Sequence, residues 1–594
     1  MASSSPVPSA VTPPFDEISQ NLTNFTNLTA AGNATADALS PQWTLFHIAS
    51  FLTMEGKLIL SALAIIYIGA HGSLRRPPSA APPKRKKGEK GDRKEDEPVT
   101  EGLMPSDAIV FPLLAGTMLI GLYYLIQWLQ DPAILNKILR VYMSVMGVAS
   151  LTTLMAHSLR VGAGFVFPGW VREGGVLCRV DDDREALVRV NEEEDDAAEA
   201  SLSRSPLPSG LRRIAAVNSA RVNRFLWDVR HLLTDDWTVR AKVHAVFREK
   251  FHLSVNHILG FFLAFATVSA YYMTGSPLLS NIMGYGFCYG SFLIMSPTTF
   301  ATGSLVLMGL FFYDIVMVFY TPYMITVATK LDVPIKLQFQ SAARSSILGL
   351  GDIVVPGIVM CLALRFDMWL HYKRQIKYVP TDLKSDKHDA NSGDVVTVSE
   401  TQHMAQKPTW VDIAGCWGDW FWSSSWSGLF KGDEATAPTV RGSTFSKTYF
   451  NASLIGYTVG MLVTLAMLTI FKHGQPALLY LVPGVLGSLW LTGLVRGELR
   501  EMWEYTEDGS LDTKDVVVEL DGNGNVIKEV KKDDGKDGEA KRKEEEDKQK
   551  TEDEKAAEEK KIAERKEAER DAERKEYSIV SFSITAPLRK SESH

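Results

Sequence analysis

Nine stretches of the chain are long, apolar and almost free of charge, and they limit what it can fold into. Crossing the hydrocarbon core of a membrane as a helix takes about 20 mostly apolar residues. In lipid the backbone must make its hydrogen bonds within the segment itself, so such a stretch forms a helix. We therefore predict an all-α polytopic membrane protein with nine transmembrane helices. The predicted spans are 50–72, 107–129, 136–158, 254–273, 277–297, 301–325, 346–370, 448–471 and 475–496.

The basic residues next to the spans predict the orientation. Lys and Arg gather on the cytosolic side of membrane proteins, and the basic run 84–87 follows the first span. Alternating from that loop places the N-terminus in the lumen and the C-terminus in the cytosol. Four N-glycosylation sequons near the N-terminus favour the same orientation, because glycosylation is lumenal. They begin at Asn21, Asn24, Asn27 and Asn33.

Polar segments separate the groups of spans. The predicted domains are a lumenal tail at 1–49, spans one to three with a basic loop at 50–158, a cytosolic insert at 159–253, spans four to seven at 254–370, a tryptophan-rich cytosolic loop at 371–447, spans eight and nine at 448–496, and a charged cytosolic tail at 497–594. The tail should begin with a β-hairpin around the turn 521–524. The stretch 537–576 is read as a solvated charged helix or a disordered segment.

The tryptophans of the 371–447 loop allow two interpretations. Indole rings favour the headgroup zone, so the cluster could dip into the membrane surface, or it could form a small folded pocket. The rings are Trp410, Trp417, Trp420, Trp422 and Trp426.

Composition excludes several other kinds of function. The formal net charge of −7 comes from the polar segments and argues against a nucleic-acid partner. None of the four cysteines belongs to a CxxC pair, so we expect neither a disulfide framework nor a metal site. We expect no cofactor.

Two acids, Asp314 and Asp352, are the only ones in the interiors of the nine predicted spans. Placing an acid at the centre of a helix in lipid costs on the order of 3 kcal/mol, so each calls for an explanation. They lie on adjacent antiparallel spans, and a rise of 1.5 Å per residue puts their depths within roughly 8 Å of one another. One such acid can be neutral and structural, but two without a basic partner indicate a functional site.

A pair of carboxyl groups can carry out peptide hydrolysis. Two carboxyls that share one site do not both ionise readily, so they hold one proton between them. The ionised member takes a proton from an attacking water, and the protonated member donates to the scissile carbonyl oxygen.

Two motifs accompany the acids. Gly349 and Gly351 precede Asp352 and carry no Cβ, so the backbone there can leave the helix and approach a substrate strand closely. A helical substrate needs such a partner, because its peptide bonds are hidden until it unwinds. Pro476 opens the ninth span at the same membrane level, where it fits either an ordinary first helical turn or a wall of the active site.

These motifs resemble a known family. Tyr-Asp, Gly-x-Gly-Asp and Pro-Ala-Leu, on the sixth, seventh and ninth of nine spans, are similar to the motifs of the GxGD aspartyl proteases, namely the presenilins and the signal peptide peptidases. The resemblance is strongest over 254–370 and 448–505, and it implies a presenilin-like helix arrangement. The residues it implies are the catalytic pair Asp314 and Asp352, the site-shaping Tyr313, Gly349 and Gly351, and the substrate-supporting Pro476, Ala477 and Leu478.

The resemblance also implies an activity and a location. It implies an aspartic endopeptidase of the endoplasmic reticulum membrane that cleaves signal peptides and the transmembrane helices of type II or tail-anchored proteins. Besides these substrates and the lipid bilayer, partners in a degradation complex and a homo-oligomer are consistent with it. Two other classes stay open from the residues alone. A proton- or cation-coupled transporter also places two acids at mid-membrane, and a non-catalytic factor could deliver membrane proteins to a degradation complex.

Overall fold

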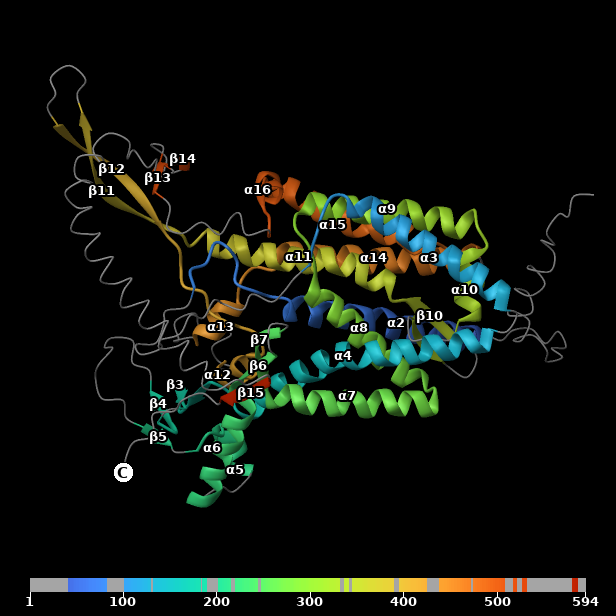
Figure 1. Ribbon diagram of the computed structural model, residues 1–594, viewed down its shortest axis with the longest axis horizontal. Coiled ribbons are helices and arrows are strands. Elements are labelled where there is room, and N and C mark those ends of the chain that lie inside the picture. The colour runs from blue at the N-terminus through green and yellow to red at the C-terminus, as the bar shows by residue number, and fades with distance from the viewer. Residues whose placement is uncertain are drawn as a thin grey trace, which may run out of the picture.

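Long helices run side by side along the long axis of the molecule, and most strands and short helices gather at one end of them (Figure 1). The computed structural model describes residues 41–82, 101–129, 132–182, 184–189, 201–203, 205–214, 219–243, 247–331, 336–340, 345–388, 395–424, 437–471, 474–507, 517–520, 526–530 and 580–585. The four sequons, the basic run 84–87, Trp426 and the charged stretch 537–576 lie outside these residues.

Within this described part, eight helices are long and apolar enough to cross a membrane. They are α2 (Pro41–Gly72), α3 (Asp107–Leu129), α4 (Pro132–Val166), α7 (Val255–Thr274), α9 (Phe300–Phe319), α11 (Gly351–Lys373), α14 (Thr448–Phe471) and α15 (Leu478–Arg496). The prediction of a helical polytopic membrane protein is therefore confirmed.

The remaining predicted span, 277–297, forms the helix α8 (Pro277–Ile294), which is not among these eight. It contains glycines and a buried Asn281, and it packs against α2, α4 and α11. Gly286 touches α4 closely, since a Cβ there would lie 3.1 Å from Leu151 Cα. These neighbouring helices therefore cover part of the surface of α8.

Both predicted spans that carry the acids differ from the helices observed. The span 301–325 stops at Phe319, because Pro322 cannot continue a helix, and a separate α10 (Tyr323–Lys330) follows. The span 346–370 begins only at Gly351, because the residues before it form the strand β10 (Ser345–Gly349), antiparallel to β9 (Lys336–Gln340). The structure thus places a β-hairpin directly before one of the two acids.

The prediction of two acids concerned the interiors of the spans, and three further charged side chains are buried nearer the span ends. Glu55 in α2 and Asp367 in α11 are also buried, with 6% and 4% of their surfaces exposed, and so is Arg365 in α11, at 3%. All three have partners: Ser346 donates to Glu55, backbone N–H groups at the start of α14 donate to Asp367, and Glu507 pairs with Arg365. These charged residues lie near the ends of the spans, and the average hydropathy of each span stays high in spite of them.

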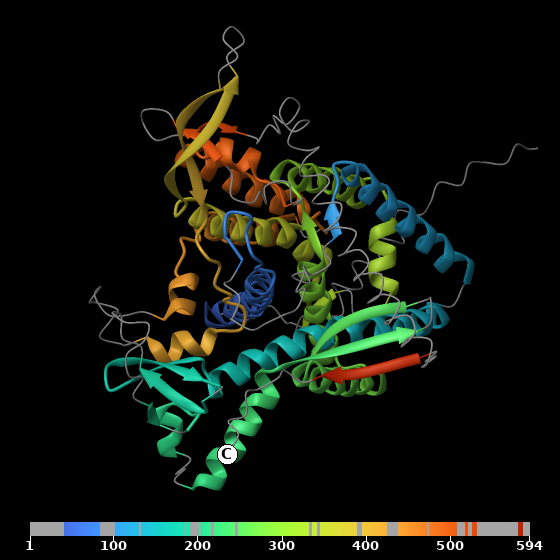
Figure 2. The same ribbon diagram turned by 60° about the vertical axis from the view of Figure 1, so that its left-hand side comes forward.

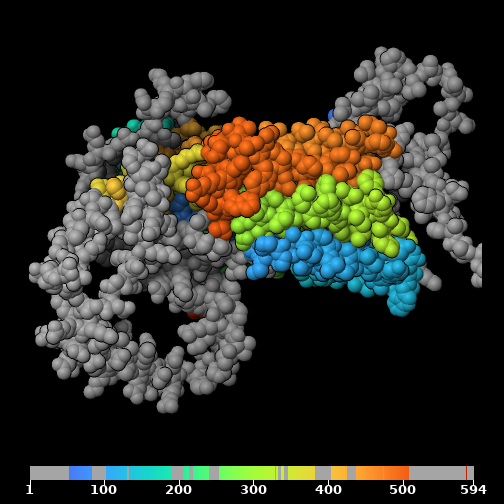
Figure 3. Space-filling view, turned by 90° about the horizontal axis from the view of Figure 1, so that it is seen from above, coloured from blue at the N-terminus to red at the C-terminus, as the bar shows by residue number. Residues whose placement is uncertain are grey.

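Helix α11 forms the centre of the membrane part. Its apolar window is 89% buried, compared with 11% for α3, and it contacts α2, α8, α9, α14 and α15. Helices α3 and α9 and the pair α14–α15 lie in adjacent rows in the space-filling view (Figure 3). The pair α14–α15 approaches closely through Gly456 and Gly484, as small residues allow between helices in membranes.

The two polar inserts fold together at one end of the helices. The first contains the antiparallel sheet β2-β3-β4-β5 and two helices, and the second contributes two short helices. Asp419 joins them by accepting hydrogen bonds from the backbone N–H of Gly169, at 2.7 Å, and of Trp170, at 3.3 Å. The elements are β2 (Trp170–Glu173), β3 (Val176–Asp181), β4 (Ala186–Arg189), β5 (Ser201–Ser203), α5 (Ser209–Ile214), α6 (Ala220–Thr234), α12 (Trp417–Ser423) and α13 (Pro438–Ser443).

The tryptophan cluster combines both interpretations of the sequence. The indole N–H of Trp422 donates to the carbonyl of Phe165 at 2.8 Å, and its ring packs on the core of the folded insert. Trp417 and Trp420 stay 41% and 54% exposed. Trp422 is therefore packed on the folded insert. For the exposed Trp417 and Trp420, a dip into the membrane surface stays a prediction.

Further strands lie outside the helical part. The predicted tail hairpin is confirmed as β13 (Val517–Leu520) and β14 (Val526–Val530), which extend the hairpin of β11 (Lys377–His388) and β12 (Val395–Gln406). Figure 2 shows this gold hairpin well apart from the sheet of β6 (Asp236–Val243), β7 (Phe247–Ser254) and β15 (Val580–Thr585). β1 (Glu101–Leu103) runs parallel to β8 (Met295–Pro297), and α16 (Leu499–Glu504) follows α15.

Candidate active site

The structure brings Asp314 and Asp352 together. Asp314 is on α9 and only 4% exposed, and Asp352 is in the first turn of the neighbouring α11. The two carboxyl groups are close enough to interact electrostatically. Asp352 keeps part of its surface accessible.

The Pro-Ala-Leu motif holds one of the acids. The backbone N–H of Leu478 donates to Asp314 Oδ2 at 3.0 Å. Leu478 is the first residue of α15, and the first N–H groups of a helix have no partner within it. A carboxylate at this position also meets the positive end of the helix dipole. Pro476 and Ala477 end the preceding loop here, so the motif positions Asp314. A wall of the active site at Pro476 stays a prediction.

The two glycines differ in their surroundings. A Cβ at Gly349 would lie 3.2 Å from Asp352 Oδ2, so any side chain there would crowd the carboxyl group. A Cβ at Gly351 would meet nothing within 4 Å. Neither glycine has a positive φ, so a left-handed backbone explains neither of them. The limited space beside Asp352 explains Gly349, and nothing in the structure explains Gly351.

Strand β10 presents an edge beside Asp352. It pairs with β9 on one side, with Gly349 opposite Lys336. The far edge of β9 is closed by Asn281, whose side chain donates to the carbonyl of Gln338 at 2.9 Å and accepts from its N–H at 2.8 Å. Within the described residues no third strand pairs with β10. An extended peptide can therefore add to β10 next to the carboxyl pair.

Two residues that support the site were missed by sequence reasoning. The hydroxyl of Ser346 on β10 donates to Glu55 of α2 at 3.0 Å, which ties the strand to the helix core. The hydroxyl of Tyr457 on α14 donates to the backbone carbonyl of Asp352 at 3.3 Å. The charge of Glu55 within an apolar stretch was a usable signal, whereas Tyr457 carried none.

Tyr313 lies next to Asp314 in the chain and comes close to α3. It precedes Asp314 on α9 and is half-buried, and a Cβ at Gly116 of α3 would lie 3.7 Å from its ring. It can therefore shape the side of the site that faces α3.

The chemistry available at this site is that of carboxyl groups. Among the residues that the structure describes, no cluster of His, Cys, Asp or Glu could hold a metal ion. The arrangement supplies a proton donor and a proton acceptor side by side, with a strand edge next to them. It fits general acid–base attack of water on an extended peptide.

The chain is similar to known proteins over most of its length. The family model described as signal peptide peptidase matches residues 94–509. Human signal peptide peptidase is 24% identical over 475 residues, which cover 79% of this chain and 87% of the human protein. Intramembrane protease 2 of Caenorhabditis elegans is 32% identical over 247 residues, or 40% of each protein. A probable intramembrane protease of Schizosaccharomyces pombe is 32% identical over 244 residues, or 40% of this chain and 61% of the yeast protein.

The similarity to the nematode and yeast proteins thus spans less than two thirds of their length, whereas the family model covers more than half of this chain. The matched range includes α9, α11 and α15, which carry the acids and the Pro-Ala-Leu motif. This chain belongs to the signal peptide peptidase family.

Proposed function

We propose that the protein is an intramembrane aspartic endopeptidase with Asp314 and Asp352 as its catalytic pair. The observation that carries the proposal is their meeting on α9 and α11, with the N–H of Leu478 on one carboxyl and the end of β10 beside the other. The family membership and the names of the matched relatives, which are intramembrane proteases, support it.

The reaction is hydrolysis by an activated water. The ionised carboxyl takes a proton from the water as its oxygen bonds to the scissile carbonyl carbon, and the protonated carboxyl donates to the carbonyl oxygen. The C–N bond then breaks as the carboxyl that took the proton from water donates it to the leaving nitrogen. The other carboxyl takes a proton back from the diol as its C=O bond forms again, so the pair returns to its starting state. The edge of β10 would hold the unwound substrate by backbone hydrogen bonds, which lipid cannot offer.

The orientation predicted from the sequence leads to a proposal about substrates. A peptide that pairs with a strand edge runs either parallel or antiparallel to that strand. A site that uses one of these pairings therefore binds its substrate in one chain direction. With a lumenal N-terminus, the enzyme should prefer substrates whose own N-terminus is cytosolic. These are signal peptides left after trimming and the helices of type II and tail-anchored proteins, and the expected location is the endoplasmic reticulum membrane.

Cleavage of a single transmembrane peptide by the purified protein in detergent tests the activity. Mass spectrometry of the products should show a cut inside the apolar segment. If the peptide is cut only in its polar flanks, or stays intact while the protein is folded, the proposed activity is wrong.

A second assay tests the substrate preference. One apolar segment is expressed in both orientations, each with a short or a long lumenal tail, together with active enzyme or its Asp352→Asn variant. We expect cutting only by active enzyme, and mainly of the short-tailed segment with a cytosolic N-terminus. Equal cutting of both orientations would contradict the substrate proposal and leave the catalytic pair untouched.

A further inference from the structure

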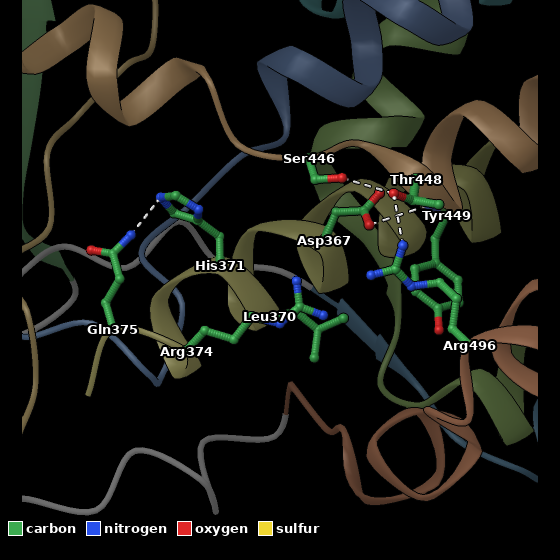
Figure 4. A pocket seen from close by; sticks show the side chains of 9 residues that line it. All are labelled: Asp367, Leu370, His371, Arg374, Gln375, Ser446, Thr448, Tyr449 and Arg496. Carbon is green, nitrogen blue, oxygen red and sulfur yellow. Dashed lines mark hydrogen bonds between the residues drawn. The ribbon is translucent and has the colours of Figure 1, made fainter. Parts of the chain in front are cut away.

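A polar cavity lies at the far end of α11 from Asp352. Its volume is about 140 Å³, and it opens where α11 ends, α14 begins and α15 ends (Figure 4). The distance along α11 from Asp352 to Arg374 is about 33 Å at the rise of an α-helix, so the cavity is separate from the catalytic pair. Its lining residues are Asp367, Leu370, His371, Arg374, Gln375, Ser446, Thr448, Tyr449 and Arg496.

Two arginines stand on the wall of this cavity in fixed positions. Arg374 and Arg496 both donate to the carboxylate of Glu498, at 2.5 Å and 2.9 Å. Their side chains remain 51% and 35% exposed. Each guanidinium has five N–H donors, so binding one shared carboxylate leaves donors of both available to another anion. Glu498 thus orients the two cations and neutralises only one of them.

The carboxylate of Asp367, which lines the cavity, already has hydrogen-bond partners in the protein. The carboxylate oxygens of Asp367 accept hydrogen bonds from the backbone N–H groups of Tyr449, at 3.2 Å, and Phe450, at 3.0 Å. Figure 4 shows Asp367 turned toward Thr448 and Tyr449. Its charge is therefore directed at the first turn of α14 and not at Arg374.

The charge balance and the hydroxyl groups favour an anion. Within the lining, Arg374 and Arg496 carry two positive charges against the single acid Asp367, which leaves one positive charge. Beside the lining, Glu498 pairs with both arginines and Lys447 interacts with Asp367, so these two further charges cancel. The hydroxyls of Ser446 and Thr448 share a hydrogen bond of 2.8 Å, so one of the two O–H groups is left to donate at the rim. A water takes about 30 Å³, so 140 Å³ has room for a group of about four or five heavy atoms, such as a phosphate.

The position of the cavity identifies where such a phosphate would come from. Three membrane-spanning helices end or begin at it, which places it at the boundary where lipid headgroups lie. Lys373 lies 4.6 Å from the ring of Trp369 at the same level, an arrangement typical of the interface. We propose that this cavity binds the phosphate of an anionic lipid headgroup through Arg374 and Arg496. Occupancy would tie together α11, which carries Asp352, and α15, which holds Asp314.

Thermal unfolding of the detergent-solubilised protein with added ligands tests this proposal. The probes are a short-chain phosphatidylserine and, separately, inorganic phosphate. We expect phosphatidylserine to raise the melting temperature of the wild type. Arg374→Gln and Arg496→Gln should each weaken this binding by roughly tenfold or more, the effect of one lost hydrogen bond between charged groups.

Two further variants separate binding from general effects. Arg500→Gln removes an 85%-exposed arginine that pairs with Glu504 outside the cavity, and it should respond to lipid as the wild type does. Ser446→Asp leaves both arginine pairs intact but adds a negative charge at the rim, and it should abolish the response.

Each outcome decides the matter. A response to inorganic phosphate at similar concentrations would keep the site and assign it to a soluble phosphate. The proposal is overturned if neither probe acts, or if Arg500→Gln reduces the response as much as the cavity variants do.

Discussion

The close contact of α14 and α15 should be required for activity, and Gly456→Ala tests this. A Cβ at Gly456 would lie 2.2 Å from the carbonyl oxygen of Gly484, whereas ordinary contacts begin at 3.4 Å. Both atoms belong to helix backbones, so neither can rotate away. The helices must separate by about 1.2 Å, the difference between these distances.

That separation should affect both stability and catalysis. Overpacking of this kind typically costs about 1–3 kcal/mol. The N–H of Leu478, at the start of α15, lies 3.0 Å from Asp314, and a shift of this size along the bond would break it. Misplacing a reacting group by about 1 Å can lower the rate by about 100-fold. We therefore expect Gly456→Ala to lose most of its peptide cleavage, measured as kcat on the transmembrane peptide.

The matched control is Gly487→Ala on α15, the helix that carries Gly484. A Cβ there would meet nothing within 4 Å, so this variant should keep wild-type activity and gain a little helix stability. If Gly456→Ala is folded and cleaves as fast as Gly487→Ala, the close helix contact does not position the acid, and the reasoning is refuted.

Three further predictions concern other parts of the molecule. Gly349→Ala should lower kcat by roughly tenfold without unfolding the protein, because its Cβ would lie 3.2 Å from Asp352 Oδ2 and push the carboxyl by a few tenths of an ångström. Glu507→Gln should destabilise the protein by about 3–5 kcal/mol in denaturant unfolding, because it leaves Arg365 buried without its counter-ion. Glycosidase should increase the mobility of protein from its native membranes, and Gln at the four sequon asparagines should remove the shift.

The stability that Glu507 provides should depend on pH, and the direction of this dependence follows from its pKa. Burial alone would raise the pKa of this carboxyl, but the guanidinium groups of Arg365 and Arg75 lower it below its usual 4.5. The stability it provides is therefore present above about pH 4.5 and is lost as the pH falls through the lower folded pKa. The wild type should lose stability in acid by a step that Glu507→Gln lacks. Equal acid sensitivity of the two proteins would contradict this.

The sequence predicted the helices and the acid pair because both depend on local composition. Long apolar runs can do little else in lipid than form helices, and acids within them stand out. It could not predict β10, since Ser346 to Leu350 is as apolar as the helix that follows, and only pairing with β9 makes it a strand. The role of Leu478 was equally hidden, because a backbone N–H contributes no residue type to a motif.

Contacts between segments far apart in the chain could not be predicted from the sequence. Asp419 and Gly169 are 250 residues apart, and nothing in either segment indicates the other as its partner. The pairing of Arg365 with Glu507 spans 142 residues and joins a predicted span to a predicted tail. Such contacts follow from the packing of the whole chain and not from local pattern.

The most direct test of the account is cleavage of one transmembrane peptide by wild type, Asp314→Asn and Asp352→Asn under identical conditions. Asn keeps the shape of the side chain and can still accept a hydrogen bond, but it can neither take a proton from water nor share one with its neighbour. Both variants should melt as cooperatively as the wild type and yield no product above background. Product from either folded single variant would contradict the central claim that these two acids together cut the peptide.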